Sequence, residues 1–151
     1  MKRLSRILMC VVLVGGIAAI AYAQFSKPAD AIKYRKAVMF LIGQHFGPMG
    51  AVVKGKQAYG QKEFLRHALL VQSLSTMTWD AFLVPGSDTG DTRLKPSALS
   101  NQAGFMKAAQ DLEDQAKKLV EAAQGGELQA IRGRFGSTAQ TCGGCHKPFR
   151  S

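Results

Sequence analysis

The most restrictive feature of this sequence is the spacing of its apolar residues, which recur every three or four positions in four stretches of about 20 residues. This is the period of an amphipathic α-helix, and little of the chain alternates as a β-strand does. Each helix would be about 30 Å long, and the connections are short. The pattern predicts an all-α fold, an antiparallel up-down-up-down four-helix bundle. The stretches cover residues 28–46, about 62–84, about 100–124 and about 127–149.

Glycine and proline mark the expected helix ends. Gly47-Pro48 is expected to end the first helix and to begin a loop over residues 47–61, while Pro85-Gly86 and Gly125-Gly126 are expected to end the second and third helices. The expected inward stripes of the first three helices are Ile32, Arg35, Met39, Ile42 and Phe46; Leu65, Leu69, Gln72, Thr76, Trp79 and Phe82; and Met106, Ala109, Leu112, Ala116, Leu119 and Ala123.

The first residues have the pattern of a secretory signal peptide. Residues 1–6 carry three basic side chains and no acid, residues 7–20 are uncharged, and Ala21 and Ala23 supply the small side chains that a signal peptidase requires. We expect residues 1–23 to be removed after Ala23, leaving a periplasmic domain of residues 24–151. An uncleaved membrane anchor is the alternative, because residues 7–23 form an uncharged run near the lower length limit for spanning a bilayer.

Composition limits the class of protein. The chain has 151 residues, of which 46% are hydrophobic, so it can bury the core of one domain but is short for a multidomain enzyme. Loss of the signal would lower the formal net charge from +10 to +7 and would also remove Cys10. The remaining positive charge favours an acidic partner such as a periplasmic redox protein. It is spread along the chain, which argues against nucleic-acid binding.

The chemistry is concentrated in Cys142-Gly143-Gly144-Cys145-His146, a C-x-x-C-H motif. This is the attachment signature of c-type haem. On a helix, positions i, i+3 and i+4 project from nearly the same side, so both sulfurs can form thioethers to one haem while the imidazole reaches its iron. The motif predicts one covalently attached haem c with His146 as axial iron ligand, and the two glycines leave the porphyrin edge unobstructed.

Three other uses of the cysteines fit less well. A thioredoxin-like dithiol follows a strand in an α/β fold, whereas this pair lies at the end of a helical pattern. A zinc site would need a fourth ligand, and no second C-x-x-C or spaced histidine pair supplies one. A disulfide across one helical turn has poor geometry.

The other side of the iron requires a residue from upstream, because only five residues follow His146. Met39 is the best placed, on the inward face of the first helix and one turn after Arg35. It can be a core methionine or a ligand. His45 and His67 are alternative ligands, although histidines in such positions are more often surface or capping residues.

These residues together resemble the cytochrome c′ family over essentially the whole of residues 24–151. The combination is more specific than the pentapeptide alone. The segments that carry the resemblance are Gln24–Pro28, Asp30–Arg35, His45–Pro48, Val53–Gly55, Trp79–Phe82 and Cys142–His146, with Arg150 four residues beyond the motif.

The resemblance implies a left-handed four-helix bundle, often a homodimer through its first two helices. It also implies that His146 is the only protein ligand of the iron and that Met39 closes the opposite face as a steric plug. By the same resemblance, Arg35 lies near the haem propionates, Phe82 packs beside the porphyrin, and Arg150 lies over the proximal face.

Two residues depart from the family pattern. Lys36 stands where the family often has Gln, and Pro148 follows His146 by two positions. Proline within a helix loses a backbone hydrogen bond and clashes with the preceding turn. We therefore expect a kink near Pro148, which puts the position of Arg150 in question.

The predicted function follows from a high-spin, five-coordinate iron, which can carry an electron and can bind a small gas. No hydrogen-bond donor is evident around Met39, so NO and CO are favoured over O₂. We expect an electron carrier that binds NO or CO, and not an enzyme, because no second acid–base histidine is placed over the distal face. The alternative is a haem-free thiol or zinc-binding protein.

Overall fold

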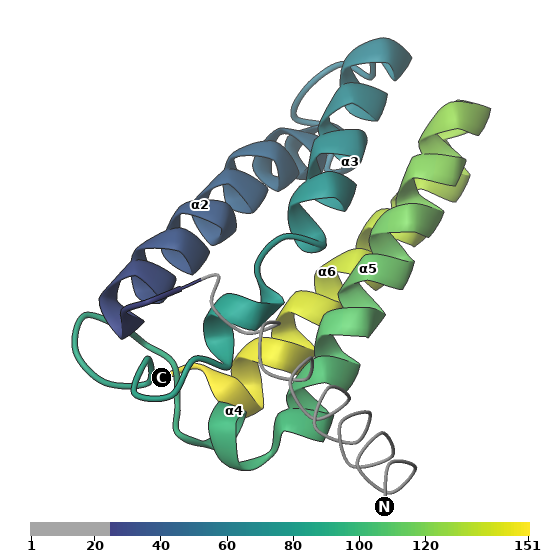
Figure 1. The fold of residues 1–151 in the computed structure, drawn as a ribbon. Coiled ribbons are helices and arrows are strands. Elements are labelled where there is room, and N and C mark those ends of the chain that lie inside the picture. Colours follow the sequence, from purple (N-terminus) through teal and green to yellow (C-terminus); the bar gives the residue numbers. More distant parts are fainter. Residues whose placement is uncertain (1–24) are drawn as a thin grey trace, which may run out of the picture.

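The computed structural model describes residues 25–151 as an antiparallel bundle of four long α-helices, which confirms the predicted all-α fold (Figure 1). Each long helix packs against the next one in the chain, and α2 also contacts α6. The predicted signal peptide, with Cys10, lies outside the described residues. The elements are α2 Pro28–Val53, α3 Gln61–Ser75, the 3-10 turn η1 Trp79–Phe82, α4 Ser97–Ser100, α5 Gln102–Gly125 and α6 Leu128–Phe149.

Helix α2 does not end at Gly47-Pro48, so the prediction of a loop from residue 47 was wrong. The helix continues through Pro48 to Val53, and the connection to α3 covers only residues 54–60. A proline inside a helix costs about 3 kcal/mol. Here the extra turns bring Met49, which is 1% exposed, into the core. Its burial, together with contacts from Val52 and Val53, offsets that cost.

Helix α3 is shorter than predicted, because it ends at Ser75 and not near residue 84. The hydroxyl groups of Ser75 and Thr76 donate to the carbonyl oxygens of Gln72 and Ser73 in its last turn. Side chains that satisfy these carbonyls provide an alternative to another helical turn. The chain then turns into η1, which separates Trp79 from the helix.

The inward face of α3 is also one residue away from the predicted stripe. Leu69 is 43% exposed, and the buried positions are Phe64, Ala68, Val71 and Ser75. The same shift occurs at the start of α5. There Met106 is 40% exposed while the adjacent Phe105 is buried. The rest of the predicted α5 stripe is buried as expected.

The end of α5 is fixed by glycine. Gly126 has a φ of 75°, the left-handed conformation that ends many helices and that glycine adopts without strain. The side-chain amide of Gln61 donates to the carbonyl oxygens of Ala123 and Gln124, so the start of α3 also satisfies this helix end. The tight turn leads directly into α6, which runs antiparallel to α5.

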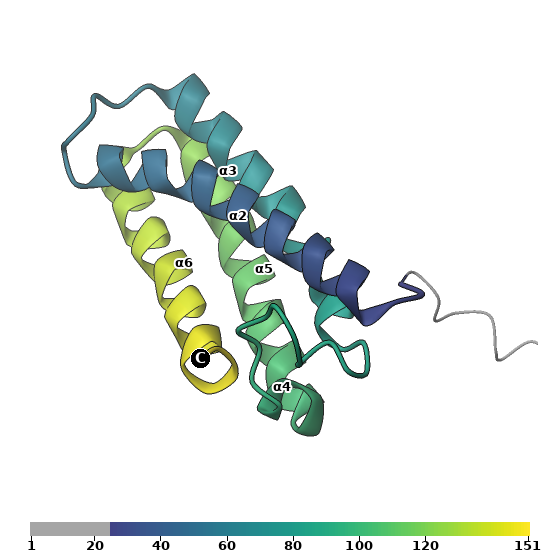
Figure 2. The same ribbon diagram turned by 90° about the vertical axis from the view of Figure 1, so that its left-hand side faces the viewer.

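Buried residues form two clusters, and the second of them prepares the site. One cluster fills the bundle between the long helices. The other surrounds Trp79, Phe105 and Phe149, and Cys142 and Cys145 pack against it. Figure 2 shows that the C-terminal end of α6 lies at the same end of the bundle as α4 and the long connection before it. Within residues 25–151 we find no helix that is both long and apolar enough to cross a membrane.

Candidate functional site

A cavity of about 580 Å³ lies between α2, η1, the 91–94 segment, α5 and α6. Its volume is within the roughly 300–1,000 Å³ typical of pockets for cofactors and other small molecules. All of the site residues predicted from the sequence line this one cavity. They are Arg35, Met39, Phe82, Cys142, Cys145, His146 and Arg150.

Helix α6 supplies the two sulfurs and the imidazole. Cys142 and Cys145 are half-buried free cysteines one turn apart, and His146 follows at the more exposed end. The thiol of Cys142 is 3.7 Å from the carbonyl oxygen of Thr138, which is the preceding turn of the same helix. Side chains at positions i, i+3 and i+4 were expected to project from nearly the same side of the helix, and all three reach the same cavity.

The surroundings of the two thiols and of the His146 imidazole favour the uncharged form of each group. Burial raises the pKa of the Cys142 thiol, and burial together with Cys142 raises that of Cys145, so both stay protonated at neutral pH. Burial, followed by the positive charges of Arg150 and Arg93, lowers the pKa of His146. A neutral imidazole has the free nitrogen lone pair that an iron ligand requires.

The lining also fits the size and polarity of a haem. Trp79, Phe105, Leu112 and Phe149 supply apolar surface for a flat macrocycle. Cationic side chains, including Arg93, lie at the same cavity and suit carboxylate groups. Among residues 25–151 no group of three His, Cys, Asp or Glu side chains could hold a metal ion, so the zinc alternative is not supported.

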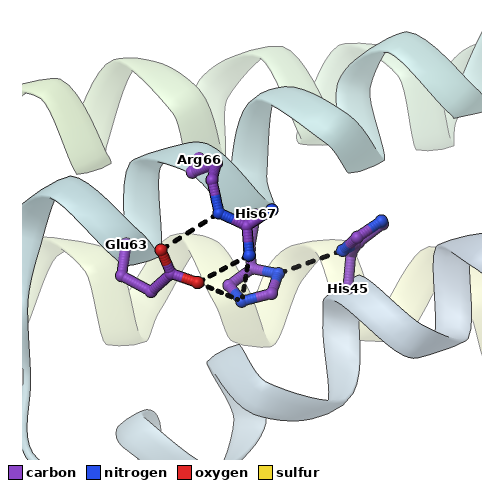
Figure 3. A network of polar contacts seen from close by, with 4 residues as sticks. All are labelled: His45, Glu63, Arg66 and His67. Atoms are coloured by element: carbon purple, nitrogen blue, oxygen red, sulfur yellow. Dashed lines mark hydrogen bonds and ion pairs between the residues drawn. The ribbon is translucent and has the colours of Figure 1, made fainter.

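Met39 lines the cavity from α2, whereas His146 lines it from α6. Met39 is partly buried and packs against both hydrophobic clusters. The two alternative ligands do not belong to this cavity. His45 and His67 contact each other between α2 and α3, with 3.1 Å between their Nδ1 atoms (Figure 3).

Arg35 has a structural task that the sequence did not reveal. It is 2% exposed, and its guanidinium donates to the carbonyl oxygen of Ala81 at 2.9 Å, to the Ser87 hydroxyl at 2.8 Å and to the Thr92 hydroxyl at 2.7 Å. It also donates to the carbonyl oxygen of Ser87 and lies 5.0 Å from the centre of the Phe82 ring. The Arg35 side chain thus fixes the position of η1 and of the segment after it, which together form one side of the cavity. Nothing in the loop sequence marks Ser87 or Thr92 as partners of a residue in the first helix.

Replacing Arg35 with methionine is expected to lower the free energy of unfolding by about 2–4 kcal/mol, because buried carbonyl and hydroxyl groups lose a charged donor. Lys36→Met is the matched control. Lys36 pairs with Asp91 at 2.6 Å, but both side chains are largely exposed, so we expect a change below about 1 kcal/mol. Urea unfolding of haem-loaded protein, followed by circular dichroism, measures both. Equal losses would refute the role given to Arg35.

The C-terminal segment closes the site in spite of Pro148. Helix α6 includes Pro148 and ends one residue later at Phe149. The backbone N–H of Lys95 donates to the carbonyl oxygen of Phe149, and Arg150 forms an isolated antiparallel bridge with Leu94. These contacts place Arg150 at the cavity and near enough to His146 to affect its pKa. The position of Arg150, which Pro148 had put in question, is therefore at the cavity.

Comparison with known proteins gives one consistent result. The family model described as Cytochrome C′ matches residues 30–150. The crystal structure of cytochrome c′ from Rubrivivax gelatinosus has a TM-score of 0.80 and 38% identity, covering 85% of this chain and 100% of that one. A variant of cytochrome c′ from Alcaligenes xylosoxidans with carbon monoxide bound has a TM-score of 0.78 and 36% identity, covering 85% and 99%. A second variant from that organism, in complex with nitric oxide, has a TM-score of 0.78 and 37% identity, covering 85% and 98%.

Proposed function

Because this chain belongs to the cytochrome c′ family, whose members bind haem c covalently through cysteines, we propose that it is an exported electron carrier that also binds NO and CO. The observation that carries the proposal is the cavity in which Cys142, Cys145 and His146 meet from one helix. The bound haem supplies one-electron chemistry and an iron with one open face. The haem-free thiol or zinc alternative has no support in the comparisons.

Each predicted site residue receives a role in this proposal. Cys142 and Cys145 would hold the haem through thioether bonds, formed by addition of each S–H across a vinyl group. The imidazole of His146 would bind the iron, and Arg150 supplies positive charge beside this imidazole. Phe82, with the Arg35 guanidinium over its ring, packs beside the macrocycle. Arg35 also places positive charge near the haem carboxylates.

The apolar residues that α2 contributes to the cavity favour NO and CO as the gases that bind. Beyond Arg35 and Lys36, the residues of α2 that line the cavity are Met39, Phe40, Ile42, Gly43 and Phe46, and none of these five has a side-chain hydrogen-bond donor. Bound O₂ is polar and gains more from such a donor than CO does. CO and NO are the ligands in the complexes of the Alcaligenes xylosoxidans variants. The cavity contains no second histidine for acid–base work, so we propose binding and electron transfer and not turnover.

Optical spectra of the oxidised and reduced holoprotein, recorded with and without NO, test this function. We expect a five-coordinate, high-spin spectrum at neutral pH and a clear change when NO is added to the reduced protein. A six-coordinate, low-spin spectrum would contradict the open iron face. A spectrum unaffected by NO would remove the gas-binding role and leave electron transfer alone.

Export and self-association belong to the same proposal. Cleavage after Ala23 would leave Gln24 as the first residue of a periplasmic protein, which N-terminal sequencing of the purified chain detects. Phe40, Leu41 and Leu69 are 63%, 42% and 43% exposed on α2 and α3. Large apolar side chains on these helices support a homodimer through them, and sedimentation analysis measures its mass. The positive net charge supports an acidic redox partner.

A further inference from the structure

Two histidines meet between α2 and α3, outside the haem cavity. The Nδ1 atom of His45 lies 3.1 Å from the Nδ1 atom of His67, and the ring centres are 5.3 Å apart with planes inclined at 46° (Figure 3). Packing of α2 against α3 brings them together across 22 residues of sequence. The chain has three histidines, and the third is His146 in the cavity. These two are therefore free of any role in holding the haem.

Glu63 and Arg66 both contact the outer nitrogen of His67. The Oε1 atom of Glu63 lies 3.2 Å from the Nε2 atom of His67, on the side of the ring away from His45. The Nη2 atom of Arg66 lies 3.3 Å from the same nitrogen, but it also donates to Glu63 at 2.6 Å. We therefore assign the proton of His67 to Nε2, where the carboxylate accepts it, so that Nδ1 presents a lone pair. His45 then donates through its own Nδ1. Burial and the charge of Arg66 lower the pKa of His67, which keeps this ring neutral at pH 7.

We propose that His45 and His67 form a binding site for one divalent transition-metal ion, held between their two Nδ1 atoms and oriented by Glu63. Metal–nitrogen bonds of about 2.0–2.1 Å, with nitrogens 3.1 Å apart, subtend an angle at the metal of about 100°. This angle lies between those of square-planar and tetrahedral coordination. The ion takes the place of the proton between the rings, and that proton moves to Nε2 of His45.

The groups around the two histidines supply the remaining interactions of the site and limit its affinity for the metal ion. A carboxylate behind a ligating imidazole is the usual arrangement in metal sites. No third His, Cys, Asp or Glu is placed to ligate among residues 25–151, so water fills the other positions. A cavity of about 270 Å³, lined in part by Glu63, Gln57 and His67 but not by His45, gives room for water beside the carboxylate. Arg66 donates to both oxygens of Glu63, at 2.6 Å and 3.0 Å, and its charge weakens the attraction for a cation.

The chemistry of the donors defines the class of metal. Imidazole nitrogen suits Zn²⁺, Ni²⁺ and Cu²⁺, and affinity within this group is highest for Cu²⁺. Mg²⁺ and Ca²⁺ prefer oxygen ligands and are not expected to bind. The proposal does not depend on the function of the haem, because neither histidine lines that cavity.

Titration of the untagged, haem-loaded, oxidised protein with Zn²⁺ by calorimetry tests the site. Haem loading converts both cysteines to thioethers, so they do not compete for zinc. We expect one Zn²⁺ per chain, no competition from Mg²⁺, and at least a tenfold loss of affinity in His45→Gln and in His67→Gln. Glu63→Gln is expected to weaken binding about 10–100-fold. Gln44→Ala, on the exposed side of α2 next to His45, is the matched control and should bind as the wild type does.

Glutamine can keep a hydrogen bond to the remaining histidine, and the haem absorption spectrum reports whether each variant has folded. With folded variants, equal Zn²⁺ affinity in the wild type and in the two histidine variants would overturn the proposal, as would the absence of binding to the wild type. Either failure would leave the haem spectrum and its response to NO unchanged. The test of this site is thus separate from the test of the proposed function.

Discussion

Removal of both sulfurs, in a Cys142→Ala/Cys145→Ala variant, is expected to abolish covalent haem attachment completely. The two thiols line the same cavity from adjacent turns of α6, and no other described cysteine is present to replace them. Mass spectrometry of the exported chain should find the mass of the polypeptide alone, and the pyridine haemochrome band of a thioether-linked haem should be absent. The thermal unfolding midpoint should also fall, because the native state loses its bound group.

The single variants Cys142→Ala and Cys145→Ala should each retain haem through one thioether and show the haemochrome band of a single linkage. Lys147→Ala, an exposed neighbour, is the control and should be fully loaded. A double variant that still carries covalent haem would contradict the attachment site.

Shortening Met39 is expected to speed the binding of CO to the reduced protein by about ten- to a hundredfold. Met39 is partly buried and packs against both hydrophobic clusters. In its proposed position opposite His146, an entering ligand has to displace it. Displacing a packed side chain costs about 1–3 kcal/mol, which corresponds to this change in rate. Stopped-flow mixing of reduced Met39→Ala with CO measures the effect.

Met39→Leu separates a steric role from ligation. If Met39 only fills space, leucine will preserve both the resting spectrum and slow CO binding. If its sulfur binds the iron, the wild type will be low-spin and the leucine variant will become high-spin. A Met39→Ala variant with the CO binding rate of the wild type would show that Met39 does not obstruct the site.

The sequence predicted well those positions at which the helical period of the apolar residues and the chemistry of the individual side chains indicate the same structure. Cys142, Cys145 and His146 were expected to project from one side of a helix, and all three line one cavity. Gly126 ends α5 where it was expected, since few other residues tolerate its positive φ. The inward face of α5 beyond Phe105 was also correct, because its apolar residues form an uninterrupted helical stripe.

Sequence reasoning failed where tertiary packing overrides a local signal. Pro48 predicts a helix end, but the burial of Met49 one residue later extends α2 past it. Leu69 is more apolar than Ala68, yet Ala68 is 1% exposed and Leu69 is 43% exposed, because packing against the neighbouring helices and not local hydrophobicity selects the buried face of α3. The partners of Arg35 could not be predicted, because the loop that contains Ser87 has no periodicity to indicate which way its side chains point.

The location of the two cysteines constrains the order of events during biogenesis. They lie in the last full turns of the final helix, half-buried against Phe105 and Phe149, with thiol pKa values raised by burial. Since the thiolate is the more reactive form of cysteine, a finished bundle offers the maturation machinery two shielded and poorly nucleophilic sulfurs. We infer that haem attachment precedes the docking of α6, and that the closing bundle then encloses the haem.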